Sequence, residues 1–480
     1  MSVSSILPDA ALWRRRPVPC SNDPMADVMI AVMPFAGHVA PLAAVAEAFV
    51  EAGHAVRVYT GRAYAERFAA LGAEVVPWQS APDFDELDLA ATFPALRGRK
   101  GPRQLLANVE HLFVGTGAAQ GDDLARAFAA RPWDVIVADG LSLGTHLVAE
   151  RLGTPSVTVS IVPLSMPTPE LPPPILPLLP ATGPLGRLRD RVLFAALETF
   201  SRGVRRAYDA QRAAFGLPPT DAPLDAAWHS PDLVCASGVP ELEFPRSSWP
   251  VRVEFVGALA PTGSIRPAPP AWWADLPDDR PIVHVSQGTL NVDPDDLIRP
   301  TFAALGRQPV SIVATTGRAD APELPFPAPP NAHVAGLVDY SALLPRLDAM
   351  ITNGGWGGVL AALTHGVPLI VAGGDIDKPV IAARVGWAGA GIDLRTGTPK
   401  PRAILRAWRR LCDDPRYRER AAAIGRALRA HDGPREVVAH TLALVERRRA
   451  ADAGARAGAS ERTQPPVMKA RTSSASNSPV

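Results

Sequence analysis

Cysteine is scarce in this chain of 480 residues, which has only Cys20, Cys235 and Cys412. Three scattered cysteines indicate neither a disulfide framework nor a metal site, and they fit a reducing compartment, so we expect a cytoplasmic protein. An excess of charge is also missing, because 49 Lys and Arg nearly balance 48 Asp and Glu. The composition therefore indicates neither a nucleic acid nor an anionic membrane surface as a partner.

Uninterrupted hydrophobic runs of membrane length are missing as well. The nearest candidate, residues 161–185, contains Glu170 and three consecutive prolines, so it cannot form a continuous spanning helix. The arginines at 14–16 are followed by Pro17 rather than by an apolar segment, so no secretory signal is indicated. We expect residues 1–24 to be a disordered extension, and whether Met1 or Met25 starts the protein stays open.

The sequence does contain a strand-then-helix alternation in each half. Strands are predicted at 28–33, 55–59, 74–77, 134–138 and 156–159, and again at 282–285, 310–313, 332–334, 349–351, 369–371 and 391–394. Continuous β-branched runs separated by helices indicate parallel sheets covered on both faces. We therefore predict an α/β protein with two Rossmann-like domains, 25–258 and 282–450, that face each other across a cleft.

Three further segments complete the predicted organisation. A Pro-rich loop at 163–184 precedes an amphipathic helix at about 185–215, for which a core-facing role is favoured and the lining of an apolar acceptor pocket is the alternative. Residues 259–281 are expected to form a semi-rigid, Pro-rich linker between the domains. The segment 451–480 lacks periodicity and aromatic residues, so we expect a disordered tail.

A glycine cluster provides the strongest functional signal. A short apolar strand ends at Thr352 and is followed by Asn353, Gly354, Gly355, Trp356, Gly357 and Gly358, which open the next predicted helix. Glycines let the backbone approach a ligand closely, and the start of a helix presents unpaired N–H groups and a positive dipole end to an anion. The next loop adds Asp377 and Lys378, which suit hydroxyl groups. Phosphate beside hydroxyls indicates a sugar nucleotide.

Two residues of the first domain suit acid–base chemistry. His38 follows the first predicted strand and Asp139 follows the strand at 134–138, so both fall at carboxyl ends of strands, where ligands bind in doubly wound sheets. A histidine can take a proton from a hydroxyl, and a buried carboxylate can fix its tautomer. The residues alone leave two interpretations open, a catalytic pair or a structural histidine, and a lone histidine is more often structural.

These motifs resemble those of the UDP-glycosyltransferase-like enzymes (glycosyltransferase family 1, GT-B fold, bacterial natural-product type). The family signature runs Thr-His-Gly-Gly-Trp-Asn-Ser, two residues, Glu, then a Pro-initiated strand and an Asp-Gln pair. Here it reads 352–358, Ala361, Pro368 and Asp377-Lys378, and the resemblance extends from about residue 28 to 445. It implies a general-base role for His38 with Asp139 as its partner, and a last helix that returns to brace the first domain.

The resemblance also implies the remaining donor contacts. The segment Ser286, Gln287, Gly288 and Thr289 matches a loop under the donor diphosphate, and Val338 lies where the family holds the nucleotide base through backbone groups. Four of the positions that depart from the family are binding residues in it. Its phosphate-binding His and Ser are Asn353 and Gly358, its ribose-binding Glu is Ala361, and the Gln of its sugar-binding pair is Lys378. Backbone amides must then carry more of the binding, and both UDP- and dTDP-sugars stay open as donors.

The resulting prediction is an inverting, metal-independent glycosyltransferase. It would move a sugar from a nucleotide diphosphate to a hydroxyl of a small, largely apolar acceptor, with no cofactor beyond the sugar nucleotide. No His, Cys or Asp cluster of the sequence has metal-ligand spacing. Two alternatives remain: a sugar-nucleotide epimerase of the same fold, and a non-catalytic binding protein with a degraded donor site. The sequence does not identify the acceptor, the sugar or the oligomeric state.

Overall fold

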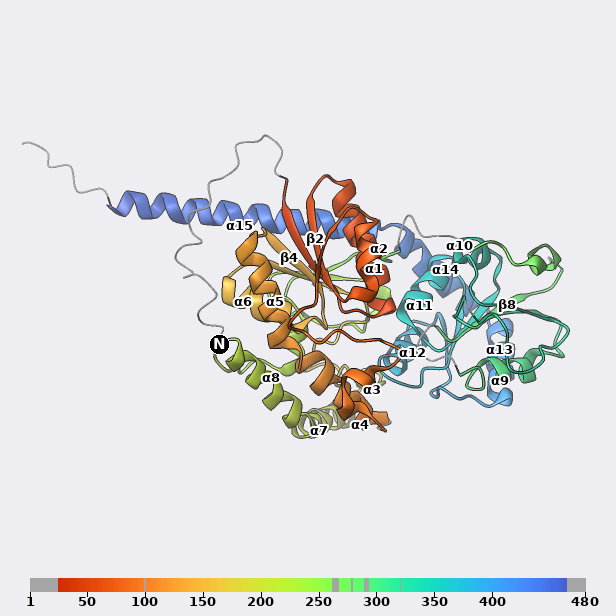
Figure 1. The fold of residues 1–480 in the computed structure, drawn as a ribbon. Helices are drawn as coiled ribbons and strands as arrows, with labels where there is room; N and C mark the ends of the chain where they lie inside the picture. The colour runs from red at the N-terminus through yellow and green to blue at the C-terminus, as the bar shows by residue number, and fades with distance from the viewer. Residues whose placement is uncertain are drawn as a thin grey trace, which may run out of the picture.

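The computed structural model describes residues 25–98, 101–260, 267–277, 279–288, 293–319 and 321–463. The predicted N-terminal extension and the site residue Thr289 lie outside these ranges. The described chain folds into two α/β halves that lie side by side, each built around its own parallel sheet (Figure 1). The predicted architecture of two Rossmann-like domains is therefore confirmed.

The first sheet has seven strands in the order β3-β2-β1-β4-β5-β6-β7, and its neighbouring strands pair in parallel. The strand order reverses between β1 and β4, which makes the carboxyl ends of these two strands the expected ligand crevice. The strands are β1 (Asp27–Ala31), β2 (Ala55–Thr60), β3 (Glu74–Pro77), β4 (Val135–Asp139), β5 (Ser156–Ser160), β6 (Val234–Ala236) and β7 (Val253–Phe255).

Alternate residues of these strands enter separate cores on the two faces of the sheet. Val28 and Ile30 pack with α1, whereas Met29 and Ala31 pack with α5 and α6 on the other side. This two-sided burial explains why apolar residues occupy consecutive positions in β1 and β4. The helices of this half are α1 (Ala36–Glu51), α2 (Ala65–Ala69), α3 (Leu89–Thr92), α4 (Gly101–Ala107), α5 (Gly117–Ala130) and α6 (Leu143–Leu152), with a π-helix, η5, at Asn108–Val114.

The predicted single helix at 185–215 is two helices, α7 (Pro184–Phe200) and α8 (Arg202–Ala214), which meet at Ser201. Only α8 is core-facing, through Val204 and Tyr208. On α7 several apolar side chains are exposed, and they include Leu185 at 82%, Leu188 at 56% and Val192 at 59%. The core-facing expectation is therefore wrong for the first half of this segment, because an apolar stripe in the sequence does not say which surface will cover it.

The second sheet has six strands in the order β10-β9-β8-β11-β12-β13, again with parallel pairs. Its order reverses between β8 and β11. The strands are β8 (Ile282–Ser286), β9 (Ser311–Thr315), β10 (Ala332–Ala335), β11 (Ala349–Thr352), β12 (Leu369–Val371) and β13 (Gly391–Asp393). The helices are α9 (Ile298–Leu305), α10 (Tyr340–Leu343), α11 (Trp356–Thr364), α12 (Lys378–Trp387), α13 (Pro401–Asp413) and α14 (Arg416–Arg429).

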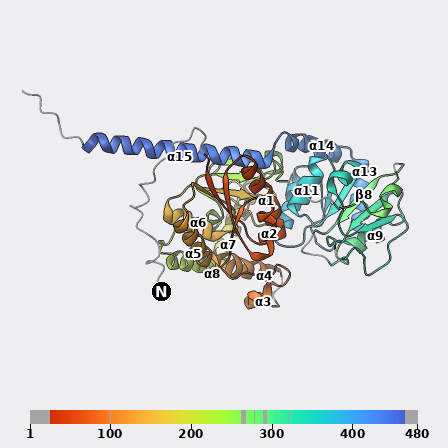
Figure 2. The same ribbon diagram turned by 45° about the horizontal axis from the view of Figure 1, so that its top comes forward.

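The last helix, α15 (Gly433–Thr463), returns from the second half and runs across the first (Figure 2). It packs against α1, and its Val437, Val438, Leu444 and Val445 belong to the hydrophobic core of the first sheet. The expected brace is thus present. The expected disorder from residue 451 is wrong for 451–463, where Ala, Arg and Glu, all strong helix formers, continue the helix. Residues 464–480 lie outside the described ranges.

The described part of the linker at 259–281 is docked on the second half. It contains a 3₁₀ helix, η8 (Ala271–Asp275), and the Trp272 Nε1–H donates to the Val334 carbonyl at 2.9 Å. The Trp272 ring also lies 5.1 Å from that of His333. Among the described residues, no helix is long and apolar enough to cross a membrane.

Candidate active site

His38 lies in the first turn of α1, which begins at Ala36. Pro41 lies in the second turn of this helix. Proline has no N–H, so the carbonyl four residues before it lacks its helical hydrogen bond. Because α1 starts directly after β1, the His38 side chain stands at the carboxyl end of that strand, beside the end of β4. His38 therefore lies next to the point between β1 and β4 at which the strand order of the sheet reverses.

Asp139 ends β4 and is completely buried. Two backbone N–H groups hold its carboxylate: Met33 donates to Oδ2 at 2.7 Å and Leu141 donates to Oδ1 at 2.9 Å. His38 Nδ1 lies 3.3 Å from Asp139 Oδ1, with the imidazole 17% exposed. The distance is within hydrogen-bond reach, but the angle is not yet suitable, and Nδ1 has no aligned partner. A small rotation of the ring would complete the predicted pair, as is common before a ligand binds.

A second imidazole lies behind Asp139. Burial, with a smaller contribution from the nearby His229, lowers the pKa of His146 to about 4, and the charge of Asp139 acts in the opposite direction. His146 is therefore neutral at physiological pH. It does not compensate the Asp139 charge, which remains available to stabilise a protonated His38.

Aromatic side chains surround His38 on the first-domain side. The rings of His38 and Phe35 are 5.5 Å apart, and Phe35 in turn lies 5.1 Å from Phe84 and 6.1 Å from Phe113. Phe113 belongs to the π-helix η5, a type of helix that is rare and often found at functional sites. These rings give His38 an apolar neighbourhood on this side.

The glycine cluster forms a turn between β11 and α11. Gly354 has a φ of 95°, which only glycine adopts without strain, and a Cβ at this position would lie 3.0 Å from Val371 Cγ1. Gly355 then caps α11, so the N–H groups of its first turn have no partner within the helix. A Cβ at Gly357 would meet nothing within 4 Å, which marks open space in front of this turn. The free N–H groups of this first turn and the open space beside them suit the binding of an anion.

The loops on either side of this turn contact it directly. On one side the Asn353 Nδ2–H₂ donates to the Gln287 carbonyl, and its Oδ1 accepts from the Gly355 N–H at 3.4 Å. On the other side a Cβ at Gly354 would lie 3.6 Å from Lys378 Cβ. The predicted donor segments that follow β8, β11 and β12 are therefore brought together at one edge of the sheet.

Several predicted donor residues use their side chains within the protein. The Gln287 amide donates to the Asp293 carbonyl at 2.7 Å and accepts from the Ile298 N–H at 3.3 Å. Ser286 Oγ accepts from the Gly288 N–H at 3.4 Å. The Asn353 amide is also partly engaged, so it serves first to join two loops. Contacts of Ser286 and Gln287 with a donor would have to come from backbone atoms.

Val338 and Ala361 offer no polar side chain to a ligand. Val338 follows β10 and is buried in the core of the second domain, so only its backbone is available. Ala361 lies on α11 and packs against the same core. Among the described residues, no group of three or more His, Cys, Asp or Glu side chains is arranged to hold a metal ion.

Asp377 and Lys378 stand at the start of α12. Asp377 is the N-cap residue, but its carboxylate makes no capping hydrogen bond, and Lys378 Nζ lies 2.8 Å from Asp375 Oδ1. Burial raises the pKa of Asp377, while the positive charges of Lys378 and His38 act against this rise. His38 of the first domain is thus close enough to Asp377 of the second for its charge to affect the pKa of that carboxyl.

Comparison with known proteins decides the family. The chain is 38% identical over 423 residues to 4'-demethylrebeccamycin synthase of Lentzea aerocolonigenes, a match that covers 88% of this chain and 99% of the relative. The chain belongs to the UDP-glycosyltransferase-like family. The glycosyltransferase is also 30% identical over 457 residues to UDP-glucosyltransferase A1 of Starmerella bombicola, covering 89% of this chain and 95% of the relative. Residues 300–444 match the family described as erythromycin biosynthesis protein CIII-like, C-terminal domain.

Solved structures confirm the GT-B fold of this glycosyltransferase. The glycotransferase of kitacinnamycin superposes with a TM-score of 0.66 at 23% identity, and the calicheamicin glycosyltransferase CalG4 with a TM-score of 0.65 at 23% identity. Both matches cover 88% of this chain and 99% of the other. The glycosyltransferase VinC, solved in complex with dTDP, gives a TM-score of 0.63 at 19% identity, with 88% and 100% covered.

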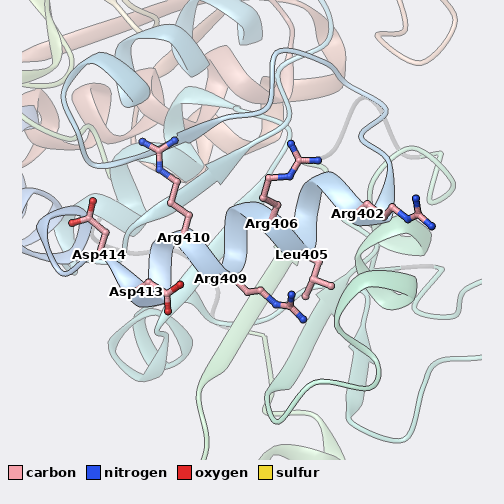
Figure 3. Close-up of a pocket in the computed structure, with 7 residues that line it drawn as sticks. All are labelled: Arg402, Leu405, Arg406, Arg409, Arg410, Asp413 and Asp414. Atoms are coloured by element: carbon pink, nitrogen blue, oxygen red, sulfur yellow. The ribbon is translucent and has the colours of Figure 1, made fainter.

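One surface hollow of the glycosyltransferase contains none of the predicted site residues. About 620 Å³ of space lies along α13 and is lined mainly by Arg402, Arg406, Arg409 and Arg410 (Figure 3). The opposite face of α13 packs Ile404, Trp408 and their neighbours on the side of the second sheet away from α11 and α12. The arginines are therefore the solvated face of an amphipathic helix.

Two functional contacts of the glycosyltransferase were not predicted from the sequence. Trp356, the first residue of α11, donates from Nε1 to Ser237 Oγ of the first domain at 2.9 Å. Arg384 of α12 pairs with Glu243, also of the first domain, at 3.1 Å. Both join helices of the donor side to one segment far away in sequence. Because no local pattern links residues more than a hundred positions apart, a single sequence carries no signal for either contact.

Proposed function

We propose that this glycosyltransferase moves a sugar from a nucleotide diphosphate to a hydroxyl of a small, largely apolar acceptor, with inversion at the anomeric carbon. The observation that carries the proposal is the 3.3 Å approach of His38 Nδ1 to Asp139 Oδ1, together with the effect of the His38 charge on the pKa of Asp377 in the second domain. A general base then faces the residues suited to hold the sugar. The aromatic surroundings of His38 support an apolar acceptor.

The chemistry follows from the two ring nitrogens of His38. Because Nδ1 faces Asp139, the acceptor hydroxyl gives its proton to Nε2. The acceptor oxygen then forms a bond to the anomeric carbon as the bond from that carbon to the diphosphate oxygen breaks. Attack from the side opposite the diphosphate inverts the anomeric configuration. Asp139 stabilises the resulting imidazolium without taking the proton.

The leaving nucleotide diphosphate would be stabilised by the start of α11. The free N–H groups of the first helical turn and the positive end of the helix dipole face the place where negative charge develops. Lys378, whose side chain is only 13% exposed, adds a cation beside this turn. These groups supply the electrostatic stabilisation that other transferases obtain from a divalent cation, which supports metal-independent transfer.

The donor nucleotide is proposed to be a uridine or thymidine diphosphate. Ala361 occupies the position at which the family reads the ribose hydroxyls, and it cannot accept a hydrogen bond from them. The site therefore has a weak demand for ribose over deoxyribose. The relatives named UDP-glucosyltransferases support a UDP-sugar, and the missing carboxylate keeps a dTDP-sugar equally suitable.

A thermal-shift panel tests the donor side of this proposal. We expect UDP- or dTDP-linked sugars, or both, to raise the melting temperature without added metal, because a ligand stabilises only the state that it binds. The same sugar nucleotides with excess chelator should give the same shift. Stabilisation that requires Mg²⁺ or Mn²⁺ would contradict metal independence, and no stabilisation by any member of the panel would contradict the donor class.

A further inference from the structure

Residues 237–246, here called the bridging segment, follow β6 of the first domain but pack into the second. Val239 and Leu242 of this segment belong to the hydrophobic core formed by α11, α12 and the strands beneath them. The segment is thus covalently part of one domain and packed in the core of the other. Its position lets it hold the two donor-side helices relative to the first sheet.

The first of these helices is held at its starting residue. Trp356 Nε1 donates to Ser237 Oγ at 2.9 Å, and both side chains are buried. A Cβ at Gly238 would lie 2.9 Å from the Trp356 ring, so the backbone of the bridging segment lies directly against the indole. The turn that presents N–H groups to the donor therefore begins at a residue fixed by the first domain.

The second helix is held by a buried ion pair. Arg384 Nε lies 3.1 Å from Glu243 Oε1 and its Nη2 lies 3.3 Å from Oε2, a two-pronged arrangement between side chains that are 2% and 7% exposed. The guanidinium also lies 4.9 Å above the Phe244 ring. Phe244 in turn contacts Trp387 of α12, with ring centres 5.4 Å apart.

The same ion pair contacts the Pro-rich loop of the first domain. Arg384 Nη2 donates to the Leu164 carbonyl at 3.3 Å, and the Leu164 N–H donates to Glu243 Oε1 at 3.3 Å. Arg246, from the end of the bridging segment, donates to the Met166 carbonyl at 3.0 Å. Three segments that are distant in sequence therefore meet at the Arg384 guanidinium: α12, the bridging segment and the start of the Pro-rich loop.

We propose that Arg384 and Glu243 are positioning residues, which hold the sugar-binding start of α12 in register with His38. Asp377 and Lys378 begin the same helix, about two turns and about 10 Å from Arg384, so a helix fixed at Arg384 carries them as a rigid body. A buried ion pair contributes little net stability compared with apolar residues of similar volume. Stability alone therefore does not account for the presence of the Arg384–Glu243 pair. The inference rests on the proposed function, because it concerns the geometry of transfer.

The test replaces the pair by an apolar pair of similar size. The double variant Glu243→Leu/Arg384→Met leaves neither Glu243 nor Arg384 without the other, but Arg246, whose Nη2 lies 3.7 Å from Glu243 Oε2, loses a carboxylate neighbour. We therefore expect the double variant to fold with a melting temperature below that of the wild type but above that of Glu243→Leu alone. UDP or dTDP, whichever the wild type binds, should bind within about threefold of wild type by calorimetry, because the groups proposed to hold it remain. Transfer should lose about 10- to 100-fold in kcat, the usual effect of misplacing reacting groups by about 1 Å.

Two further variants sharpen the result. Arg384→Lys keeps the charge but loses the planar two-pronged geometry, so its kcat should fall between those of the wild type and the double variant. The matched control is Glu51→Leu/Arg435→Met, which removes an exposed ion pair between α1 and α15 and should leave kcat unchanged. If the double variant does not fold, Arg384→Lys and Glu243→Gln, which keep the side-chain volume, carry the same expectation of lower kcat at unchanged nucleotide affinity.

Two outcomes would overturn the inference. One is a folded double variant that transfers sugar at the wild-type rate. The other is a loss of nucleotide affinity as large as the loss of kcat, which would mean that the pair shapes the nucleotide site rather than its register with His38. Failure of the wild type to transfer from any UDP- or dTDP-sugar would instead overturn the proposed function, and this result is seen before any variant is made.

Discussion

Removal of the His38 imidazole is the change that best distinguishes a defect in the sugar-transfer step from a defect in nucleotide binding. The side chain is 17% exposed and lies in the first domain, whereas the predicted diphosphate cradle is built from the second. His38→Ala should therefore leave nucleotide affinity within about twofold of wild type. Transfer should fall by about 10²- to 10⁴-fold, the usual contribution of a positioned general base.

The structure predicts a different result for its partner. Asp139 accepts one backbone N–H on each carboxylate oxygen, from Met33 and Leu141. Asparagine has one oxygen, so in Asp139→Asn one of these buried N–H groups faces an amide NH₂ and loses its acceptor. This should lower the free energy of unfolding by about 1–3 kcal/mol. Transfer should fall by a factor smaller than or comparable to that of His38→Ala, because Asp139 orients the base without touching the acceptor.

The assay is acceptor-dependent release of nucleotide diphosphate, with the melting temperature and nucleotide affinity of each variant measured in parallel. His365→Ala is the matched control, since this exposed imidazole follows α11 at the opposite end from the glycine turn and hydrogen-bonds to the Ala361 carbonyl. It should behave as wild type. Near-wild-type transfer by His38→Ala, or a loss of nucleotide affinity equal to the loss of rate, would refute the assignment of His38 as the base.

Three other predictions concern the second domain. Asp377→Ala should raise the donor KM and lower kcat, with about 10- to 100-fold lost in kcat/KM if its carboxylate binds the sugar hydroxyls; unchanged steady-state kinetics would remove it from the site. Gly354→Ala should weaken nucleotide binding, measured by calorimetry, because φ at this position is 95° and the new Cβ would lie 3.0 Å from Val371. The control Gly183→Ala should leave nucleotide binding unchanged, because Gly183 has an extended backbone and open space around it. Burial lowers the pKa of His284 from 6.5 to about 4. Between these two pH values the unfolded chain binds more protons than the folded one, so the folded state loses stability as the pH falls. The loss reaches about 3 kcal/mol at pH 4. A denaturation series from pH 7 to 4 should show this loss and His284→Gln should reduce it; equal slopes for both proteins would contradict the argument.

The parts of the site that were predictable from the sequence are those that follow strand ends. His38 and Asp139 are about a hundred residues apart, yet parallel sheets bring the carboxyl ends of β1 and β4 to one edge, and the two side chains meet there. The same reasoning placed Asn353 and Lys378 at one edge of the second sheet. Such placement needs only the alternation of strands and helices, which hydrophobic patterns reveal well.

Side-chain use within the site was not predictable in this way. Gln287 and Asn353 have donors and acceptors that suit a ligand, but the folded protein uses them to join α9, the β8 loop and the glycine turn. Which partner such a group takes depends on atoms from other segments. The same holds for α7, whose apolar stripe gave no indication that it would face outward, and for Arg384 and Glu243, which are ordinary charged residues until the domains pack together.

The stereochemistry of one reaction tests the central claim most directly. The wild-type protein is incubated with an α-linked UDP- or dTDP-sugar and a small apolar acceptor that carries a hydroxyl, and the products are followed by NMR. A general base that activates the acceptor opposite the diphosphate predicts a β-glycoside, formed one for one with nucleotide diphosphate. An α-glycoside, or a 2-epimerised sugar in place of a glycoside, would contradict the mechanism proposed for His38 and Asp139.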